Sequence, residues 1–566
     1  MHVRATYSHS CGPLVTEHVR VTFLGGLGEI GRNCLALEQD GRIVVVDAGL
    51  MFPEPNMYGV DLILPDFRWL IERRDRVDGI VLTHGHEDHT GALRYLVKDV
   101  NVPIYGAPLT VGFARHRLTE AKVAKDLTFI EVADGERRRI GPFEVEFIPV
   151  THSVPSAHAL AFHTKLGIVV HSGDFKLDAT PIDNRRTDLA RLAALGDEGV
   201  ALLLCDSTNA EEPGFTPSER SVGVALRRLF LERPERRLVV ACFASHVHRV
   251  QQIMDVAVAQ GRKIALMGRS MEANVKLARK LHLLTVDAAD LIDIENVGRF
   301  APGEVCVICT GSQGEPLAAL SKLSRGDARN FAVGPDDTVI LSSHPIPGNE
   351  WSVGRVIDDL HRAGTEVIHS GHEPVHASGH ARQGELRTYH QLLRPKNFVP
   401  VHGEYRHMVH HAELAVSMGL SSTHVLICED GDQVELSAKG IRRAGQVPAG
   451  FHYIDGSAGD LDERPLEERR MLAEYGVVMI SAGVNRRSGE LSQEVAVSAR
   501  GWFEGDADRA VLSALTDSVR DALVVALREG ERDGEKLNKV TQRAAGRLLG
   551  QRFRRQPVIM PSIVVD

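Results

Sequence analysis

The stretch that decides the fold is Gly79-Ile80-Val81-Leu82-Thr83, followed directly by His84-Gly85-His86-Glu87-Asp88-His89. The first part is an apolar run, which predicts a buried strand. The second part places five metal-capable side chains within six residues. Imidazole suits zinc and similar ions, and carboxylate adds charge and can bridge two ions. Because polar loops seldom space such groups in this way, we interpret the run as a metal-binding loop rather than a solvated, histidine-rich turn.

Four other apolar runs each end in a single potential ligand. Taken alone, each such residue would more often be a cap or a turn residue than a ligand. In a chain that already carries the cluster at 84–89, a shared metal site is the better interpretation. The four residues are Asp47 after 44–46, His152 after 147–151, Asp174 after 168–173 and His402 after 397–401.

In order and spacing, these residues resemble the first four motifs of the metallo-β-lactamase superfamily, over roughly residues 18 to 210. The resemblance implies a site for two divalent ions, in which Asp174 bridges both ions and Asp47 orients a ligand. The ligands that it assigns are His84, His86 and His152 for one ion, and Asp88, His89 and a later histidine for the other.

Later residues resemble the β-CASP branch of that superfamily, which acts on nucleic acids. Cys205-Asp206-Ser207-Thr208-Asn209 is similar to its motif A, with Asp206 as the motif acid. After a long insertion, His376-Ala377-Ser378-Gly379-His380 is similar to motif B. His402 is similar to motif C and would complete the second metal site. The insertion argues against a plain lactamase or glyoxalase, which needs no such domain.

Five strings along the chain are informative: 25–31 (GGLGEIG), 243–249 (FASHVHR), 310–316 (TGSQGEP), 345–350 (PIPGNE) and 376–380 (HASGH). With them, the chain resembles the bacterial ribonuclease J family over essentially its whole length. One residue departs from the family pattern, because asparagine is common in the family at the position of His246.

The resemblance implies an α/β architecture, a metallo-β-lactamase αββα sandwich with an inserted α/β β-CASP domain and a small C-terminal α+β domain. The patterns agree, because short strands dominate up to 210, strands alternate with helices from about 215, and Asp40-Gly41 predicts a hairpin turn. We expect a disordered tail at 1–17, the first domain at 18–214 and 375–436, the inserted domain at 215–374, a glycine-rich linker at 437–460 and the C-terminal domain at 461–566.

Composition fits a globular cytoplasmic protein. The chain has 566 residues, of which 43% are hydrophobic and 25% charged, and no apolar run is long enough to span a membrane. Seven scattered cysteines suggest a reducing compartment. Cys306 and Cys309 have metal-motif spacing but lie in an apolar run, so we expect buried strand thiols. His2, His9 and Cys11 could bind metal, although the residues before Thr16 look like a tail rather than a signal peptide.

Two divalent ions suit hydrolysis of a phosphodiester, and zinc is favoured by the histidine-rich ligands, with manganese as the alternative. We expect His380 to act on the scissile phosphate, and we count Asp47, Asp174 and Asp206 with it as catalytic residues. The resemblance also implies an RNA phosphate pocket that holds a 5′-monophosphate. Its residues are Ser245, His246 and Val247 with His376, Ala377, Ser378, Gly379 and His380.

Two weaker signals remain. Gly59, Asp61 and Asp455 are similar to family segments that hold an additional calcium or manganese ion, although solvated acids explain them equally well. A run of arginines near the C-terminus is either a solvated face or an RNA contact. It comprises Arg543, Arg547, Arg552, Arg554 and Arg555.

The leading hypothesis is a metal-dependent 5′→3′ exoribonuclease, and potentially an endonuclease, of rRNA and mRNA maturation and decay. Its partners would be single-stranded RNA and RNA-decay proteins. The resemblance also implies that the chain forms a homodimer or tetramer through its C-terminal domain. A net charge of −9 is weak evidence against RNA, since a basic channel suffices. The alternatives are a β-CASP endonuclease of the polyadenylation-factor type and an inactive RNA-binding or scaffold paralogue, which should have lost ligands.

Overall fold

The computed structural model describes residues 18–329, 331–346, 348–456, 459–502, 507–553 and 556–566. The expected tail at 1–17, with His2, His9 and Cys11, lies outside them. The chain divides into two compact units, each described here by itself. Unit 1 comprises Met1–Phe52 and Leu62–His452, and unit 2 comprises Pro53–Asp61 and Tyr453–Asp566. None of the helices in the described ranges is long and apolar enough to cross a membrane.

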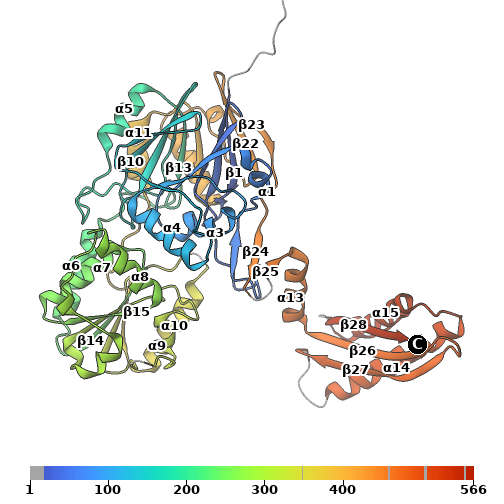
Figure 1. Ribbon diagram of the computed structural model, residues 1–566. Helices are drawn as coiled ribbons and strands as arrows, with labels where there is room; N and C mark the ends of the chain where they lie inside the picture. The colour runs from blue at the N-terminus through green and yellow to red at the C-terminus, as the bar shows by residue number, and fades with distance from the viewer. Residues whose placement is uncertain (1–17, 330, 347, 457–458, 503–506, 554–555) are drawn as a thin grey trace, which may run out of the picture. The chain divides into compact units, whose positions relative to one another are not determined.

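Two sheets in unit 1 pack face to face (Figure 1). Apolar side chains from both, such as Phe23, Val46, Phe147 and Leu202, fill the layer between them. The larger sheet has the order β23 (Gly440–Gln446), β22 (Asp432–Ser437), β1 (Val19–Gly25), β3 (Cys34–Gln39), β4 (Arg42–Val46), β6 (Val77–Val81), β7 (Ile104–Gly106) and β8 (Phe129–Glu131). The smaller has the order β20 (Phe398–Val401), β13 (Val200–Asp206), β12 (Gly167–His171), β11 (His158–Thr164), β10 (Phe143–Pro149) and β9 (Arg137–Ile140).

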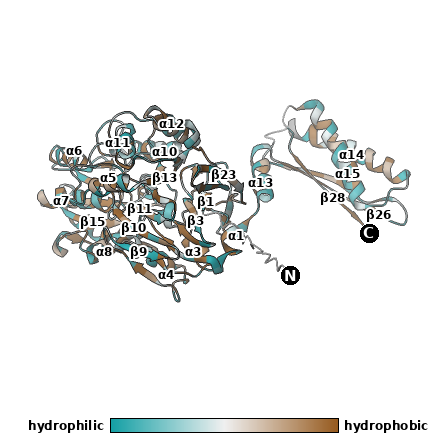
Figure 2. Cartoon of the chain, turned by 90° about the horizontal axis from the view of Figure 1, so that it is seen from above, coloured by the Kyte–Doolittle hydropathy of each residue, from teal (hydrophilic) through white to brown (hydrophobic). Residues whose placement is uncertain are grey.

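Helices cover the outer side of the smaller sheet. Leu192, Leu386 and Leu414 pack onto strand residues such as Val170 and Phe398. The three residues belong to α5 (Leu189–Glu198), α11 (Gln383–Leu393) and α12 (Tyr405–Ser417). In Figure 2 the hydrophobic colour concentrates on the strands, whereas the helices over them are mixed.

The predicted hairpin at Asp40-Gly41 is confirmed. Gln39 pairs with Arg42, and both turn residues take positive φ, 52° and 76°, as a two-residue type I′ turn requires. The segment predicted as a linker differs from the expectation. Its residues 440–446 form β23 and pair with β22 at the edge of the larger sheet.

The inserted domain is a parallel sheet with helices on both faces, as the alternating pattern predicts. The strand order is β16 (Leu291–Ile292), β15 (Lys263–Met267), β17 (Val305–Cys309), β14 (Arg237–Ala241), β18 (Asp337–Leu341) and β19 (Glu366–His369). The helices are α6 (Glu219–Leu231), α7 (Val247–Ala259), α8 (Arg269–Lys280), α9 (Ala319–Ser324) and α10 (Glu350–Arg362). Cys306 packs on one face with α6, α7 and α8, and Cys309 on the other with α9 and α10, so the two thiols are buried strand residues.

Unit 2 is an α+β module. Its sheet has the order β27 (Glu490–Arg500), β26 (Val477–Asn485) and β28 (Val558–Val565). One face, with Val478, Ile480 and Ile563, is buried under α14 (Ala507–Arg528) and α15 (Gly534–Arg552). The polar helix α13 (Glu463–Tyr475) precedes the sheet.

Candidate metal centre and phosphate-binding loop

Strand direction gathers the predicted site residues at one end of the sandwich. Strands β4 and β6 are parallel neighbours, so Asp47 and His84 leave the larger sheet at the same edge. In the smaller sheet β12, β13 and β20 are also parallel neighbours. Asp174, Asp206 and His402 follow their carboxyl ends. Ligands that are far apart in sequence therefore meet because the strands before them end side by side.

The first ligand group consists of three imidazoles and one carboxylate. Nδ1 of His86 lies 3.1 Å from Nε2 of His84 and 3.2 Å from Nε2 of His152. Oδ2 of Asp174 lies 3.6 Å and 3.8 Å from the same two Nε2 atoms. Burial lowers the pKa of His84 and of His152 well below the usual value, and that of His86 to about 4. The group thus presents neutral imidazoles, the form that binds a cation.

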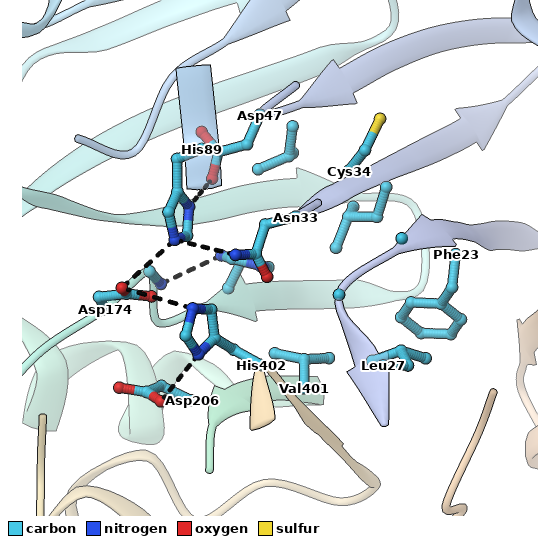
Figure 3. Close-up of a pocket in the computed structure, with 16 residues that line it drawn as sticks. Phe23, Leu27, Asn33, Cys34, Asp47, His89, Asp174, Asp206, Val401 and His402 are labelled. Atoms are coloured by element: carbon cyan, nitrogen blue, oxygen red, sulfur yellow. Dashed lines mark hydrogen bonds and ion pairs between the residues drawn. The ribbon is translucent and has the colours of Figure 1, made fainter. Parts of the chain in front are cut away.

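The second group also contains Asp174, which lies between His89 and His402 (Figure 3). Oδ2 of Asp174 lies 3.2 Å from Nε2 of His89 and 3.6 Å from Nε2 of His402. Oδ2 of Asp88 lies 3.6 Å and 3.4 Å from these nitrogens. Burial alone would lower the pKa of His89 and of His402, but Asp174 and Asp88 outweigh it and raise both. The carboxylates of Asp88 and Asp174 therefore favour a positive charge within the second group.

Both groups have dimensions that suit a metal ion. Ligands about 2.0–2.2 Å from zinc at tetrahedral angles are about 3.4 Å apart. The separations given above run from 3.1 to 3.8 Å, and all four ligand atoms of each group lie within 4.8 Å of one another. The two ligand sets implied by the resemblance are thus each assembled, and Asp174 lies between them.

Asp47 lies behind the ligands. Its backbone takes a positive φ of 59°, and its carboxylate accepts from the backbone N–H and the hydroxyl of Thr83, each at 2.8 Å. Oδ2 also lies 2.8 Å from Nδ1 of His89, which fixes the tautomer so that Nε2 faces the ligand group. Thr83 Oγ1 lies 3.0 Å from Nδ1 of His84 and fixes the tautomer of that ring in the same way.

Asp206 connects His380 to His402. Its Oδ2 lies 2.8 Å from Nδ1 of His380. Its Oδ1 accepts from the hydroxyl of Thr208 at 2.7 Å, and that hydroxyl lies 2.7 Å from Nδ1 of His402. Burial by itself would lower the pKa of His380, but Asp206 outweighs it and raises the value to about 9. His380 is therefore protonated at neutral pH and can donate a proton.

The loop 376–380 is held against the candidate metal centre. The carbonyl of Gly379 accepts from Nδ1 of His152 at 2.8 Å, and a Cβ on Gly379 would lie 2.6 Å from that ring. Ser378 Oγ accepts from Asn209 Nδ2 at 2.9 Å and from the N–H of His380 at 3.2 Å. No acceptor for the hydroxyl's own hydrogen is found among the described residues, so it remains available for a phosphate oxygen.

Two other residues of this loop, Ala377 and His376, are buried and half-buried, respectively. Ala377 is buried in the core of the inserted domain. Nδ1 of His376 is buried and has no hydrogen-bond partner in the described part of the chain. Burial lowers the pKa of His376 to about 3, so this imidazole is neutral.

The string 245–247 lies at the start of α7. Ser245 is half-buried, whereas His246 and Val247 are only 3% and 2% exposed. The imidazole of His246 lies 3.4 Å from Glu219 and accepts from the N–H of Arg249 at 3.4 Å. Arg249 also donates to the carbonyl of Val375, which brings this string close to the loop 376–380. RNA contact by His246 would require its present bonds to open.

The residues predicted for an additional cation lie together in unit 2. The N–H of Gly456 donates to Oδ2 of Asp61 at 2.6 Å. Arg469 donates to Oδ2 of Asp455 at 2.8 Å and to the carbonyl of Tyr58, next to Gly59. A guanidinium thus already neutralises Asp455, and the cation site stays a prediction.

Sequence reasoning missed four residues that contact the predicted ones. Thr83 and Thr208 hold ligand histidines, Asn209 holds Ser378, and Asn33 lies against His89 at 3.1 Å. Thr83, Thr208 and Asn209 adjoin recognised motif residues, so a search for hydroxyls and amides beside ligands would have found them. Asn33 gave no local signal.

Comparisons with known proteins agree with this architecture. Four family descriptions match: "Metallo-beta-lactamase superfamily" over 27–238, "Ribonuclease J, beta-CASP domain" over 235–360, "Zn-dependent metallo-hydrolase RNA specificity domain" over 368–427 and "Ribonuclease J C-terminal domain" over 465–565.

Similar proteins cover nearly the whole chain. Ribonuclease J of Mycolicibacterium smegmatis is 42% identical and covers 98% of each chain. Ribonuclease J 1 of Streptococcus pyogenes is 38% identical, over 97% of this chain and 98% of that one. Ribonuclease J of Helicobacter pylori 26695 is 36% identical, over 96% of this chain and 79% of that one. A crystal structure of a protein of unknown function from Enterococcus faecalis is 18% identical with a TM-score of 0.54, over 74% of this chain and all of the other, and shares the fold.

Proposed function

The chain belongs to the ribonuclease J family and is a metal-dependent ribonuclease, and from this we propose that it degrades single-stranded RNA from the 5′ end in the 5′→3′ direction. We propose further that it prefers a 5′-monophosphate, that it also cuts RNA internally, and that it serves rRNA and mRNA maturation and decay. The observation that carries the proposal is the Asp206 carboxylate, which bonds His380 directly and reaches His402 through the hydroxyl of Thr208. The polyadenylation-factor and scaffold alternatives are not favoured by the comparisons.

The ligand chemistry supports two divalent ions, zinc before manganese, because imidazoles outnumber carboxylates. His84, His86, His152, Asp88, His89 and His402 would hold them, with Asp174 between. When bound, such ions polarise the phosphodiester and neutralise its growing charge. The residues of the chain do the rest. Asp47 and Thr83 fix ligand tautomers, and His380 holds a proton at its imidazole for the leaving oxygen.

In the proposed hydrolysis the oxygen of water bonds to phosphorus, the water gives up a proton to the solvent, and the bond from phosphorus to the 3′ oxygen breaks. That oxygen takes the proton of His380, and the phosphate stays on the downstream nucleotide. Each cleavage therefore leaves a new 5′-monophosphate, which the Ser378 hydroxyl and its neighbours can bind again. This supports repeated 5′→3′ removal of nucleotides.

The test is the decay of one end-labelled RNA that bears a 5′-monophosphate, a 5′-triphosphate or a 5′-hydroxyl. We expect mononucleotide products and the fastest decay with the monophosphate. Equal decay of all three from the 5′ end contradicts the preference. Products of intermediate length, without mononucleotides, contradict the exonuclease.

We also propose a cytoplasmic homodimer or tetramer that associates through the C-terminal domain and meets RNA-decay proteins. The outer face of its sheet supports this, since Met479, Met560 and Val564 are 44%, 51% and 62% exposed there. The six described cysteines are buried free thiols, which fits a reducing compartment.

A further inference from the structure

Asn33 lies beside the second ligand group but has none of the roles assigned above (Figure 3). It precedes β3, and its backbone N–H donates to the carbonyl of Asp88 at 3.0 Å. Its own carbonyl accepts from the N–H of Gly49 at 3.0 Å. The residue is therefore fixed against the two segments that carry Asp47 and His89.

The side-chain amide points at the site. Nδ2 of Asn33 lies 3.1 Å from the carbonyl oxygen of Asp88 and 3.1 Å from Nε2 of His89. The first contact decides the orientation, because a flipped amide would set two acceptors against each other. One hydrogen thus faces Asp88 and the other faces Nε2 of His89. An amide nitrogen does not ligate a cation, so Asn33 is placed as a donor rather than as a ligand.

A cation bound to the second ligand group would leave this second hydrogen without its acceptor. Nδ1 of His89 is bonded to Asp47, so Nε2 is the atom that a cation would take. A cation at Nε2 would take the lone pair of that nitrogen, so the second amide hydrogen of Asn33 would have no acceptor on His89. Asn33 lines the same small cavity as Asp174 and His402, where an oxygen of a bound substrate would accept this hydrogen.

A clamp holds the preceding residues rigid. Arg32 is 1% exposed and donates to Oε1 of Glu29 at 2.7 Å and to Oδ2 of Asp430 at 2.8 Å. Asp430 Oδ1 accepts from the N–H of Leu27 at 3.0 Å, and the guanidinium lies 4.3 Å above the ring of Phe451. A donor fixed in this way needs no reorganisation during the reaction.

We propose that Asn33 is a catalytic residue, whose amide donates to a non-bridging oxygen of the scissile phosphate. The inference rests on the proposed hydrolysis at this centre. Charge on the non-bridging oxygens must be stabilised as water attacks phosphorus, and a preorganised donor does so without changing its own covalent state. Removal of one comparable donor typically lowers kcat by about 100- to 1,000-fold.

The test uses the full chain with Asn33→Ala and Asn33→Asp, and with Asn101→Ala as a matched control on an exposed asparagine. Zinc and manganese per chain are measured by elemental analysis. kcat and KM are measured on 5′-monophosphorylated RNA. The same RNA is then prepared with sulfur replacing either non-bridging oxygen at the first linkage.

We expect Asn33→Ala to keep the metal content and KM of the wild type while kcat falls about 100-fold. With sulfur at the oxygen that Asn33 binds, this difference should shrink to within about tenfold, because sulfur is a poor acceptor. Asn33→Asp has the same shape and an added charge, so it should keep the metals and still lose turnover.

An unchanged kcat in Asn33→Ala overturns the proposal, as does loss of an ion, which would make Asn33 a positioning residue of the metal centre. Normal turnover in Asn33→Asp also overturns it. A wild type that binds metal but cleaves no RNA would instead count against the proposed function.

Discussion

At the scale of single residues, Asp174 is the point where the two ligand groups meet. Its Oδ2 faces four imidazoles, those of His84, His89, His152 and His402. These neighbours hold the pKa of the buried carboxyl well below its usual value, although burial opposes them. One ionised oxygen thus serves both groups.

We expect Asp174→Ala to abolish RNA cleavage and to remove at least one ion, because both groups lose their shared carboxylate. Elemental analysis and an RNA cleavage assay check this together. The exposed Asp126→Ala serves as the control. Two ions per chain with normal activity would refute the role of Asp174.

His380 lies beside both ligand groups, since its ring centroid is 5.1 Å from that of His152 and 5.4 Å from that of His402. We predict that it acts on the substrate rather than as a ligand, although with Asp174, Asp206 and His402 it forms a third candidate ligand group. We expect His380→Ala to lower turnover by about 100- to 10,000-fold while both ions and RNA affinity are kept. Metal analysis, filter binding and single-turnover rates test this. A missing ion in the variant would instead place His380 among the ligands.

At the scale of elements, helices α11 and α12 meet through a buried histidine pair. Nε2 of His390 lies 3.2 Å from Nε2 of His411, whose Nδ1 lies 2.9 Å from Ser207 Oγ. Ser207 donates to the carbonyl of Cys205, so it accepts from His411, and His390 must donate to His411. Packing of the two helices thus supports the loop that carries Asp206.

This pair predicts a pH effect on stability. Burial lowers the pKa of His390 to about 4, below its unfolded value of about 6.5. The unfolded chain then binds more protons between these values, so the contribution is present above pH 6.5 and is lost as the pH falls toward 4. At pH 5 the loss is about 2 kcal/mol.

We therefore expect His390→Gln, which keeps a donor toward His411 but does not titrate, to lose less stability than the wild type between pH 7.5 and pH 5. Urea unfolding at both pH values measures the difference. The exposed His116→Gln is the control. A parallel decline of wild type and His390→Gln would show that His390 contributes nothing to the pH dependence.

At the scale of the whole molecule, the inserted domain and the sandwich meet at the loop 376–380. Arg249 of the inserted domain binds the carbonyl of Val375, and Gly379 binds the ligand His152. RNA end recognition would therefore join the two domains of unit 1.

We expect Ser378→Phe to remove the preference for a 5′-monophosphate over a 5′-triphosphate, since the ring displaces the free hydroxyl. Internal cleavage of a long RNA should suffer less. Decay rates of both RNAs and of a circular RNA, with exposed Ser417→Phe as control, test this. A retained preference would locate the 5′ phosphate elsewhere.

Self-association of the full chain can be tested with a substitution in unit 2. We expect Met479→Glu to dissociate the oligomer, because the charge would be buried on the open sheet face beside Met560. Light scattering at several concentrations measures this, with Glu494→Lys, which is already polar and exposed, as control. An unchanged mass in Met479→Glu would exclude this face.

The sequence by itself determined the family and the order of elements, and it predicted the ligand chemistry. Local spacing and apolar runs are visible in one dimension, so the cluster 84–89 and the residues at the strand ends could be predicted as metal ligands. The tertiary structure alone decided which groups meet. Asp88 and His402 are 314 positions apart and follow strands of different sheets, and the face-to-face packing of the two sheets brings them within 3.4 Å. The burial of His246 and the orientation of the Asn33 amide likewise follow from long-range packing. A local sequence pattern cannot encode a contact between residues that separate strands bring together.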